Sequence, residues 1–141
     1  MTAAHSRVAL AGVAMLTLPA CQSSKAQLLK ADASAVKLRS IQTRAFDTTE
    51  KDATLRAVMA TLQDLGFVID DAEDTLGTVS ATKLDKYALR MTVSVRPRGT
   101  TQLLVRASAQ YNLRAVEDPG PYQQFFDALG QAMFLAAQQV E

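Results

Sequence analysis

The chain has 141 residues, a formal net charge of +1 and 6% aromatic residues, so neither its charge nor its stacking capacity argues for a nucleic-acid partner. Its single His and single Cys, His5 and Cys21, both lie within the first 21 residues. If this stretch is a targeting segment that is processed, the working protein has no histidine and no free thiol. Such a protein cannot use Ser-His-Asp or Cys-His catalysis and has almost no route to a structural zinc site.

Residues 1–20 have the pattern of a signal peptide. Arg7 precedes Val8–Leu18, an uncharged and largely apolar run of eleven residues. A helix needs about 20 residues to cross the hydrocarbon core of a membrane, so this run is too short to span it but suits the apolar core of a signal peptide. The alternatives are an ordinary secretory signal with a coincidental Cys, or a short buried helix.

The stretch Leu18-Pro19-Ala20-Cys21, followed by polar sequence from Gln22, resembles the lipobox of bacterial lipoproteins. The resemblance implies cleavage between Ala20 and Cys21 and a covalent lipid on Cys21, with no other cofactor. Each acyl methylene buried in a bilayer contributes ~0.8 kcal/mol, so two or three chains would anchor the protein permanently in membrane lipid. Because Gln22 rather than Asp follows the Cys, the resemblance implies the outer membrane, with the protein on its periplasmic face.

Cleavage would leave 121 residues, with 14 basic and 14 acidic side chains once Arg7 is removed. Residues 22–39 are small and polar and show no clean apolar period. Leu28, Leu29, Val36 and Leu38 could sit on a frayed helix, but no strong cap frames one. We therefore predict that residues 21–39 form the lipidated N-terminus and a flexible tether, which could reach up to about 60 Å when fully extended. Residues 40–141 are predicted to form a single domain.

The domain begins with a predicted strand over Ser40–Phe46 and a helix behind it. Asp47 and Glu50 have the spacing of a capping box, which predicts the start of the helix. Gly66 follows the helix at the usual place for a left-handed C-cap. Apolar residues at spacings of three and four give the helix one stripe, which consists of Leu55, Val58, Met59, Leu62 and Leu65.

A second predicted strand begins at Phe67–Ile69, passes through an acidic turn or bulge at Asp70–Asp74, and resumes over Leu76–Lys83. Two further strands, Tyr87–Arg96 and Gln102–Arg114, alternate apolar and polar residues.

A last helix, starting at Pro121, has one broad apolar face, in which Gly130 suggests close packing. The order β-α-β-β-β-α predicts an α+β fold, a two-layer sandwich in which an antiparallel sheet has both helices on one face.

Strand alternation places polar side chains on the sheet face away from the helices. Arginines suit planar recognition of carboxylates and phosphates, so this face could dock a protein partner, peptidoglycan carboxylates or lipid head groups. The alternative is an ordinary solvated face, since Thr and Arg are good residues for exposed strands. The candidate partner-binding residues are Arg90, Thr92, Arg96, Arg106, Gln110 and Arg114, accompanied by Ser94, Ser108 and Asn112.

Three other groups could carry chemistry. The carboxylates of Asp70, Asp71, Glu73 and Asp74 could do acid–base chemistry or bind calcium, but they lack the pattern of a calcium loop and also fit a solvated turn. Tyr111 and Tyr122 could anchor an interface, yet both fall on core stripes and are predicted to be core. Lys83 and Lys86 could serve a Ser or Thr nucleophile, but they sit at strand ends typical of solvated charges. We therefore expect no catalytic site and no metal.

Three segments carry a second resemblance: Phe46–Glu50, Leu62–Asp70 and Leu76–Lys83. They resemble a recurrent pattern in small proteobacterial envelope lipoproteins and are more weakly similar to the repeated domain of BamC-type assembly lipoproteins, although this chain has one such domain and not two. The resemblance implies a non-catalytic structural or accessory subunit of an envelope complex for assembly, secretion or transport, with no nucleic-acid partner. The alternative is a binding module for peptidoglycan or another anionic envelope ligand.

Overall fold

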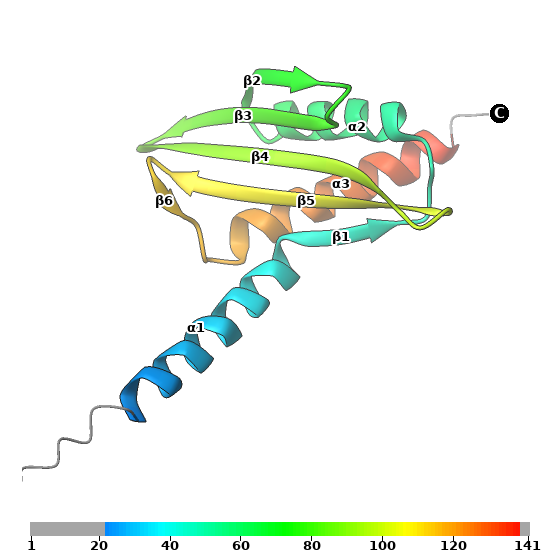
Figure 1. Cartoon of the computed structure of the whole chain (residues 1–141). Coiled ribbons are helices and arrows are strands. Elements are labelled where there is room, and N and C mark those ends of the chain that lie inside the picture. The colour runs from blue at the N-terminus through cyan, green and yellow to red at the C-terminus, as the bar shows by residue number, and fades with distance from the viewer. Residues whose placement is uncertain (1–21, 139–141) are drawn as a thin grey trace, which may run out of the picture.

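A computed structural model describes residues 22–138, which form three helices and a six-stranded antiparallel sheet (Figure 1). The strand order is β1-β5-β4-β3-β2, and the short β6 pairs with β5. The elements are α1 (Gln22–Ile41), β1 (Thr43–Phe46), α2 (Lys51–Asp64), β2 (Val68–Glu73), β3 (Thr78–Asp85), β4 (Tyr87–Arg98), β5 (Gln102–Tyr111), β6 (Arg114–Ala115) and α3 (Gly120–Gln138).

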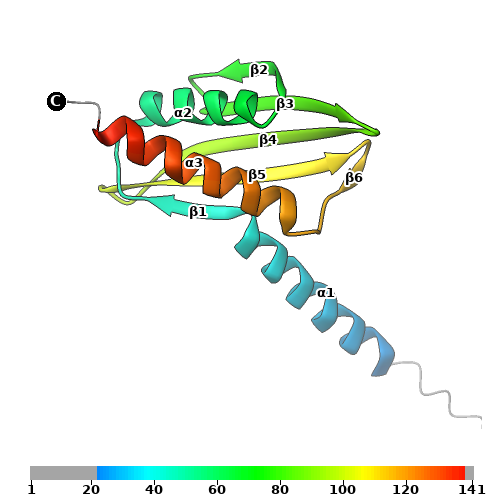
Figure 2. The same cartoon turned by 180° about the vertical axis from the view of Figure 1, so that it is seen from behind.

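The sheet has one covered and one open face. Strands β1 and β2 lie at opposite ends of the main strand order, so α2, which connects them, runs across the sheet. Helix α3 lies beside α2 on the same face, and the view from behind shows both helices over the strands (Figure 2). The predicted two-layer α+β sandwich with both helices on one face is confirmed.

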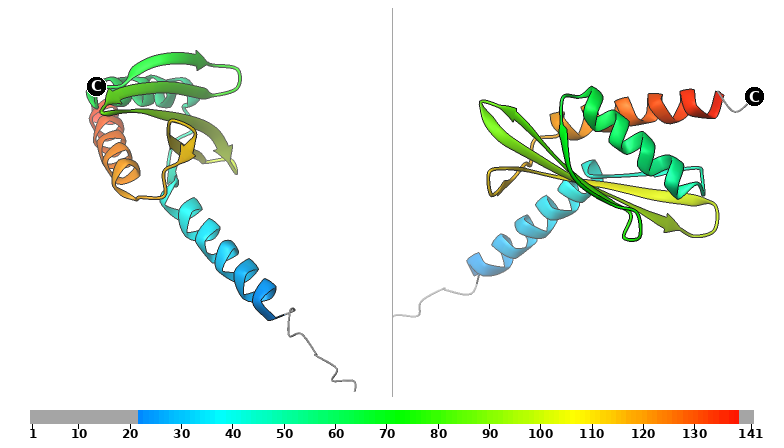
Figure 3. Two further views of the ribbon diagram at one scale, coloured as in Figure 1. Left: turned by 90° about the vertical axis from the view of Figure 1, so that its left-hand side faces the viewer. Right: turned by 90° about the horizontal axis from the view of Figure 1, so that it is seen from above.

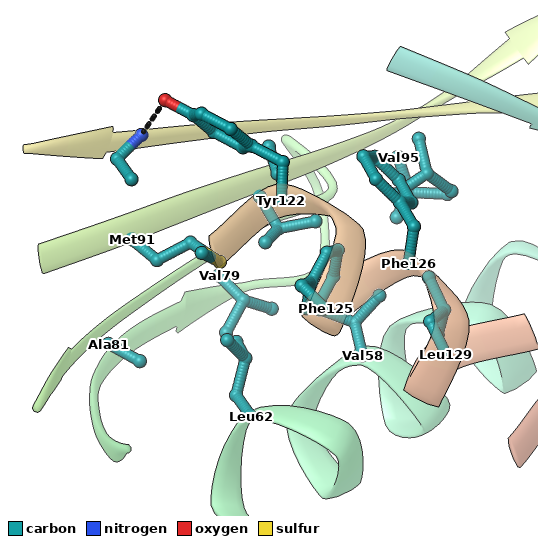
Figure 4. Packing of buried hydrophobic residues seen from close by; sticks show 14 of the residues in the cluster. Val58, Leu62, Val79, Ala81, Met91, Val95, Tyr122, Phe125, Phe126 and Leu129 are labelled. Atoms are coloured by element: carbon teal, nitrogen blue, oxygen red, sulfur yellow. Dashed lines mark hydrogen bonds between the residues drawn. The ribbon is translucent and has the colours of Figure 1, made fainter. Parts of the chain in front are cut away.

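The core lies between the sheet and these two helices, as alternation along the strands predicts. In Figure 4, side chains from β3 and β4 meet those of α2 and α3. The Phe125 and Phe126 rings lie edge to face, with centroids 5.1 Å apart. Tyr122 is fully buried beside them, which confirms its predicted place in the core. The buried inward strand residues are Val79, Ala81, Met91, Val93, Val95, Leu103, Val105, Ala107 and Ala109.

Of the two predicted ends of α2, the C-terminal one is confirmed and the N-terminal one is wrong. Gly66 follows the C-cap Leu65 with a φ of +85°, so the predicted left-handed end is confirmed. The predicted capping box is wrong: the N-cap is Glu50, and no side chain caps the helix. The Asp47 carboxylate instead accepts a hydrogen bond from the Gln102 amide of β5, which draws it away from the helix.

The second predicted strand is a hairpin. The acidic residues belong mostly to β2, whose register with β3 shifts between Ile69 and Asp71, so the bulge was the correct alternative and the turn was wrong. The turn occupies residues 74–77, so it starts only at the last residue of the predicted acidic segment and ends at Gly77, with a φ of +68°. A Cβ at this position would lie 2.6 Å from the Val95 carbonyl oxygen, so the turn requires glycine.

Helix α1 occupies the range for which a flexible tether was predicted, and that prediction is wrong. The helix projects away from the sheet, and residues 25–34 are exposed (Figure 3). Only its C-terminal end packs on the core, through Leu38 and Ile41. A helix that is exposed on all sides needs no apolar stripe, so the spacing of apolar residues did not predict it. Its Ala, Leu, Lys and Gln content nevertheless favours a helix, and neither Gly nor Pro interrupts it. None of the described helices combines the length and apolarity required to cross a membrane.

Candidate functional site

The open face of the sheet is organised in rows by the strand register. Residues paired across neighbouring strands point to the same face, so each row is a line of adjacent side chains. Three rows run from β3 through β4 to β5: Thr82, Arg90 and Gln110; Ser80, Thr92 and Ser108; Thr78, Ser94 and Arg106. Because both helices lie on the other face, nothing in residues 25–138 covers these rows as a layer.

Five of the six predicted partner-binding residues share this face. Arg90, Arg106 and Gln110 occupy the rows named above, and Thr92 lies at their centre. Arg96 lies on the same face one row further along β4, opposite the half-buried Leu104. All of these side chains are exposed except Thr92, which is half-buried between its neighbours.

Arg114 is the exception, and its predicted place on the open face is wrong. It pairs with Tyr111, which in turn pairs with Leu89, a residue in register with the core side of β4. The chain reverses at Asn112, with a φ of +54°, so the alternation that runs through β5 does not continue to Arg114. The same reversal leaves Tyr111 at the end of the sheet with 41% of its surface exposed, so its predicted burial in the core is also wrong.

Carboxylates from β2 extend the rows at one edge. Asp71 pairs with Ser80, and Glu73 pairs with Thr78, so both belong to the open face. Asp70, at the bulge, accepts a hydrogen bond of 2.6 Å from the Thr82 hydroxyl and lies 4.0 Å from the Arg90 guanidinium. The face is therefore divided, with acidic groups on the edge strand and arginines on β4 and β5. Sequence reasoning missed this neighbourhood because it predicted a turn or bulge for the acidic residues and did not pair them with the strand that follows.

The centre of the face is held by short polar contacts. The Ser80 and Thr92 hydroxyls lie 3.3 Å apart, and the Ser108 hydroxyl donates to the Thr92 carbonyl at 3.4 Å. Within residues 25–138 the salt bridges are Arg44–Asp127 and Arg90–Asp70, so Arg96 and Arg106 have no carboxylate within 4.0 Å in that range. Two guanidinium groups thus remain available for planar anions such as carboxylates.

Several chemical roles find no assembled site in the described part of the chain. No group of three or more His, Cys, Asp and Glu residues there is placed to hold a metal ion. Lys83 points to the helix side, where its ammonium donates to the Leu65 carbonyl at 2.9 Å, while Lys86 is exposed in the turn between β3 and β4. Neither lysine lies among the hydroxyls at the centre of the open face. Ala20 and Cys21 fall outside the described residues.

No protein-family model matches the chain, and no curated protein matches it in sequence.

Proposed function

We propose that this protein is a lipid-anchored, non-catalytic accessory subunit of a cell-envelope complex on the periplasmic face of the outer membrane, and that it docks a protein partner through the open sheet face. The observation that carries the proposal is the division of that face into a carboxylate edge on β2 and arginines on β4 and β5. Because the opposite charges lie on separate strands, a partner with the complementary charge pattern can bind in only one favourable orientation. A subunit with a fixed place in a complex needs such a single orientation.

The same division favours a protein over a purely anionic ligand. Peptidoglycan carboxylates or phosphates would be attracted by Arg96 and Arg106 but repelled by Asp71 and Glu73 a few strands away. A protein surface can present both signs. The open face also carries no aromatic ring among its described residues, so it offers no stacking platform. An anionic envelope ligand remains the second candidate, supported by the two arginines that have no carboxylate within 4.0 Å.

Helix α1 suits the proposed anchor as a spacer. It begins at Gln22, directly after the proposed lipid-bearing Cys21, and its 20 residues make a rod of about 30 Å. A rod fixes the height of the domain above the membrane more narrowly than a flexible tether of the same number of residues. A partner with its own fixed position in the membrane would then meet the open face at a defined height.

The partner face is tested by affinity capture from detergent-solubilised membranes after chemical cross-linking. We expect a stable protein partner with the unmodified chain and its loss when Arg90, Arg96 and Arg106 are all changed to Ala. The control changes three other basic residues, Arg56, Lys86 and Arg114, none of which belongs to the rows of the open face. Equal capture by both triple variants would contradict the proposal.

Charge reversal at the β2 edge separates the two candidates. Asp71→Lys with Glu73→Lys should abolish capture of a protein partner, since one half of the complementary pattern is inverted. The same double variant should bind purified cell-wall sacculi as well as or better than the unmodified chain if the ligand is anionic. Retention on sacculi in the absence of any protein would support the second candidate and contradict the first.

The anchor has its own test. Cys21→Ser should move the protein from the outer-membrane fraction of a sucrose gradient to the soluble fraction and abolish labelling by a fatty-acid probe. Cys21→Ser leaves every described residue unchanged, so partner capture in solution should persist. A variant that stays both membrane-bound and labelled would contradict the lipid anchor.

A further inference from the structure

Gly130 lies in the middle of α3 with no internal reason to be glycine. A Cβ built there would have no atom within 4 Å outside its chain neighbours and the helix's own backbone, so the close packing predicted from sequence is wrong. Glycine weakens a helix interior relative to alanine because it loses more backbone freedom on folding. The space beside Gly130 therefore calls for an explanation outside the packing of the domain.

That space is part of an apolar groove between α2 and α3, with a volume of about 470 Å³. The half-buried Phe46 and the buried Thr54 belong to its lining, most of which is apolar. Small residues keep the walls apart. They are Ala53 and Ala57 on α2, and Gly130, Ala136 and Ala137 on α3, with Met133 and Phe134 completing the α3 wall.

The groove is bordered by apolar surface that the domain leaves exposed. Phe134 is 65% exposed although it lines the groove, and Ala136 and Ala137 of the same α3 wall are exposed as well. A large apolar side chain left exposed in the wall of a groove of this volume is typical of a docking site for another apolar surface.

The groove lining also carries negative charge. Asp47 and Glu50 line the groove, and no basic residue does. The neighbouring Lys51 is turned away, because its ammonium donates to the Asp74 and Thr75 carbonyls at 2.9 and 3.2 Å. The single charged residue of α3 is Asp127, which pairs with Arg44. A ligand with apolar side chains flanked by positive charge would complement both features.

We propose that the groove binds an amphipathic helix of another protein, with apolar residues at positions i, i+3, i+4 and i+7 in the groove and Lys or Arg against Asp47 and Glu50. A second copy of this chain would bring two acidic linings together if it used the same surface. The groove lies on the helix layer towards the C-terminal end of α3, away from α1 (Figures 1 and 2). An occupant would thus leave both the open face and α1 free, so the inference is independent of the function proposed above.

The test uses three fluorescein-labelled synthetic peptides of 18 residues and the chain from residue 21 to 141 with Cys21→Ser. One peptide has Leu at the groove-facing positions and Lys elsewhere, the second has Glu in place of Lys, and the third is a scramble of the first. We expect fluorescence anisotropy to show saturable binding of the Leu/Lys peptide, at least tenfold tighter than binding of either other peptide. No saturable binding of that peptide, or equal binding of the scramble, would overturn the proposal.

Two variants place the binding in the groove. Gly130→Leu should fill it and reduce affinity at least tenfold, whereas Gln131→Leu adds the same side chain to α3 outside the groove lining and should leave affinity unchanged. Glu50→Lys with Asp47→Lys should shift preference to the Leu/Glu peptide. Melting curves check folding, and Gly130→Ala should raise the melting temperature because the added Cβ meets no obstacle. Unchanged affinity in Gly130→Leu would overturn the assignment.

Two other possible occupants of the groove, a second copy of the chain and a lipid surface, are tested with the same proteins. Sedimentation velocity of the unmodified and Gly130→Leu proteins reports self-association, and flotation with vesicles of phosphatidylglycerol and phosphatidylethanolamine reports membrane binding. The proposal expects neither to depend on Gly130. A dimer lost in Gly130→Leu would assign the groove to a second copy and overturn a foreign helix, and vesicle binding lost in that variant would assign it to a lipid surface with the same consequence.

Discussion

The Tyr122 hydroxyl donates a hydrogen bond to the Val116 carbonyl at 2.7 Å, which ties the start of α3 to the segment that follows β6. The same oxygen accepts from the backbone N–H of Ala109 and from the Gln42 amide, each at 3.2 Å. One hydroxyl offers one donor and two acceptor positions, so its capacity is fully used. Figure 4 shows the bond to the β5 nitrogen. One buried atom of α3 thus holds β5, the segment after β6 and Gln42, which follows α1.

Tyr122→Phe should lower the free energy of unfolding by about 2–3 kcal/mol, because it leaves buried donors and an acceptor without a partner. Urea denaturation followed by far-UV circular dichroism measures the change. The matched control is Tyr111→Phe, which removes a hydroxyl from a tyrosine that is 41% exposed and should change stability by less than about 0.5 kcal/mol. Equal losses in the two variants would show that the buried hydroxyl contributes nothing beyond its volume.

The alternation of apolar and polar residues predicted the fold because it reports which side of each strand faces the helices. In a sheet covered on one face, that side is the same for every strand. This alternation placed Arg90, Arg106 and Gln110 on one face correctly. It failed where local backbone geometry breaks the period: the reversal at Asn112 moved Arg114 to the other face. A positive φ at a residue other than glycine leaves only a weak trace in the sequence, although Asn is among the residues that adopt it most often.

The groove and α1 were missed for a different reason. Patterns of apolar residues report contacts within one chain, and α1 makes almost none outside Leu38 and Ile41. Gly130 was interpreted as a site of close packing within the domain, but the space beside it is open. A glycine in a helix can make room for a neighbour inside the fold or for one outside it. Only the positions of surrounding atoms distinguish the two.

Gly77→Ala should cost about 2–4 kcal/mol, since alanine must adopt a positive φ and its Cβ meets the Val95 carbonyl oxygen at 2.6 Å. Gly99→Ala is the control: its φ is +62°, but a Cβ there meets nothing within 4 Å. It should cost only the conformational term of about 1 kcal/mol. The difference between the two variants in the free energy of unfolding, measured by chemical denaturation, isolates the contribution of the steric clash. Equal costs would mean that the hairpin between β2 and β3 shifts to accommodate the methyl group.

Two buried threonines of α2 give a second matched pair. Thr54 donates its hydroxyl to the Glu50 carbonyl at 2.8 Å, whereas the Thr61 hydroxyl has no hydrogen-bond partner. Thr61→Val replaces an unpaired buried oxygen with a methyl group of similar size and should leave stability unchanged or raise it by up to about 1 kcal/mol. Thr54→Val loses a hydrogen bond and should lower stability by about 1 kcal/mol. Thermal unfolding of both variants checks the order, and a larger loss in Thr61→Val would reveal a polar partner of that hydroxyl.

Helix α1 should behave as a rod whose integrity is separate from the stability of the domain. Ala31 lies in its exposed middle, and proline within a helix removes a hydrogen bond and costs about 3 kcal/mol locally. Ala31→Pro should therefore reduce ellipticity at 222 nm while leaving the denaturation midpoint of the domain unchanged. Distances between spin labels on exposed residues at the two ends of the helix should broaden in the variant, and Ala31→Ser, which keeps the backbone N–H, should leave them narrow. A lowered midpoint in Ala31→Pro alone would show that the middle of α1 supports the core, and that the rod and the domain fold as one unit.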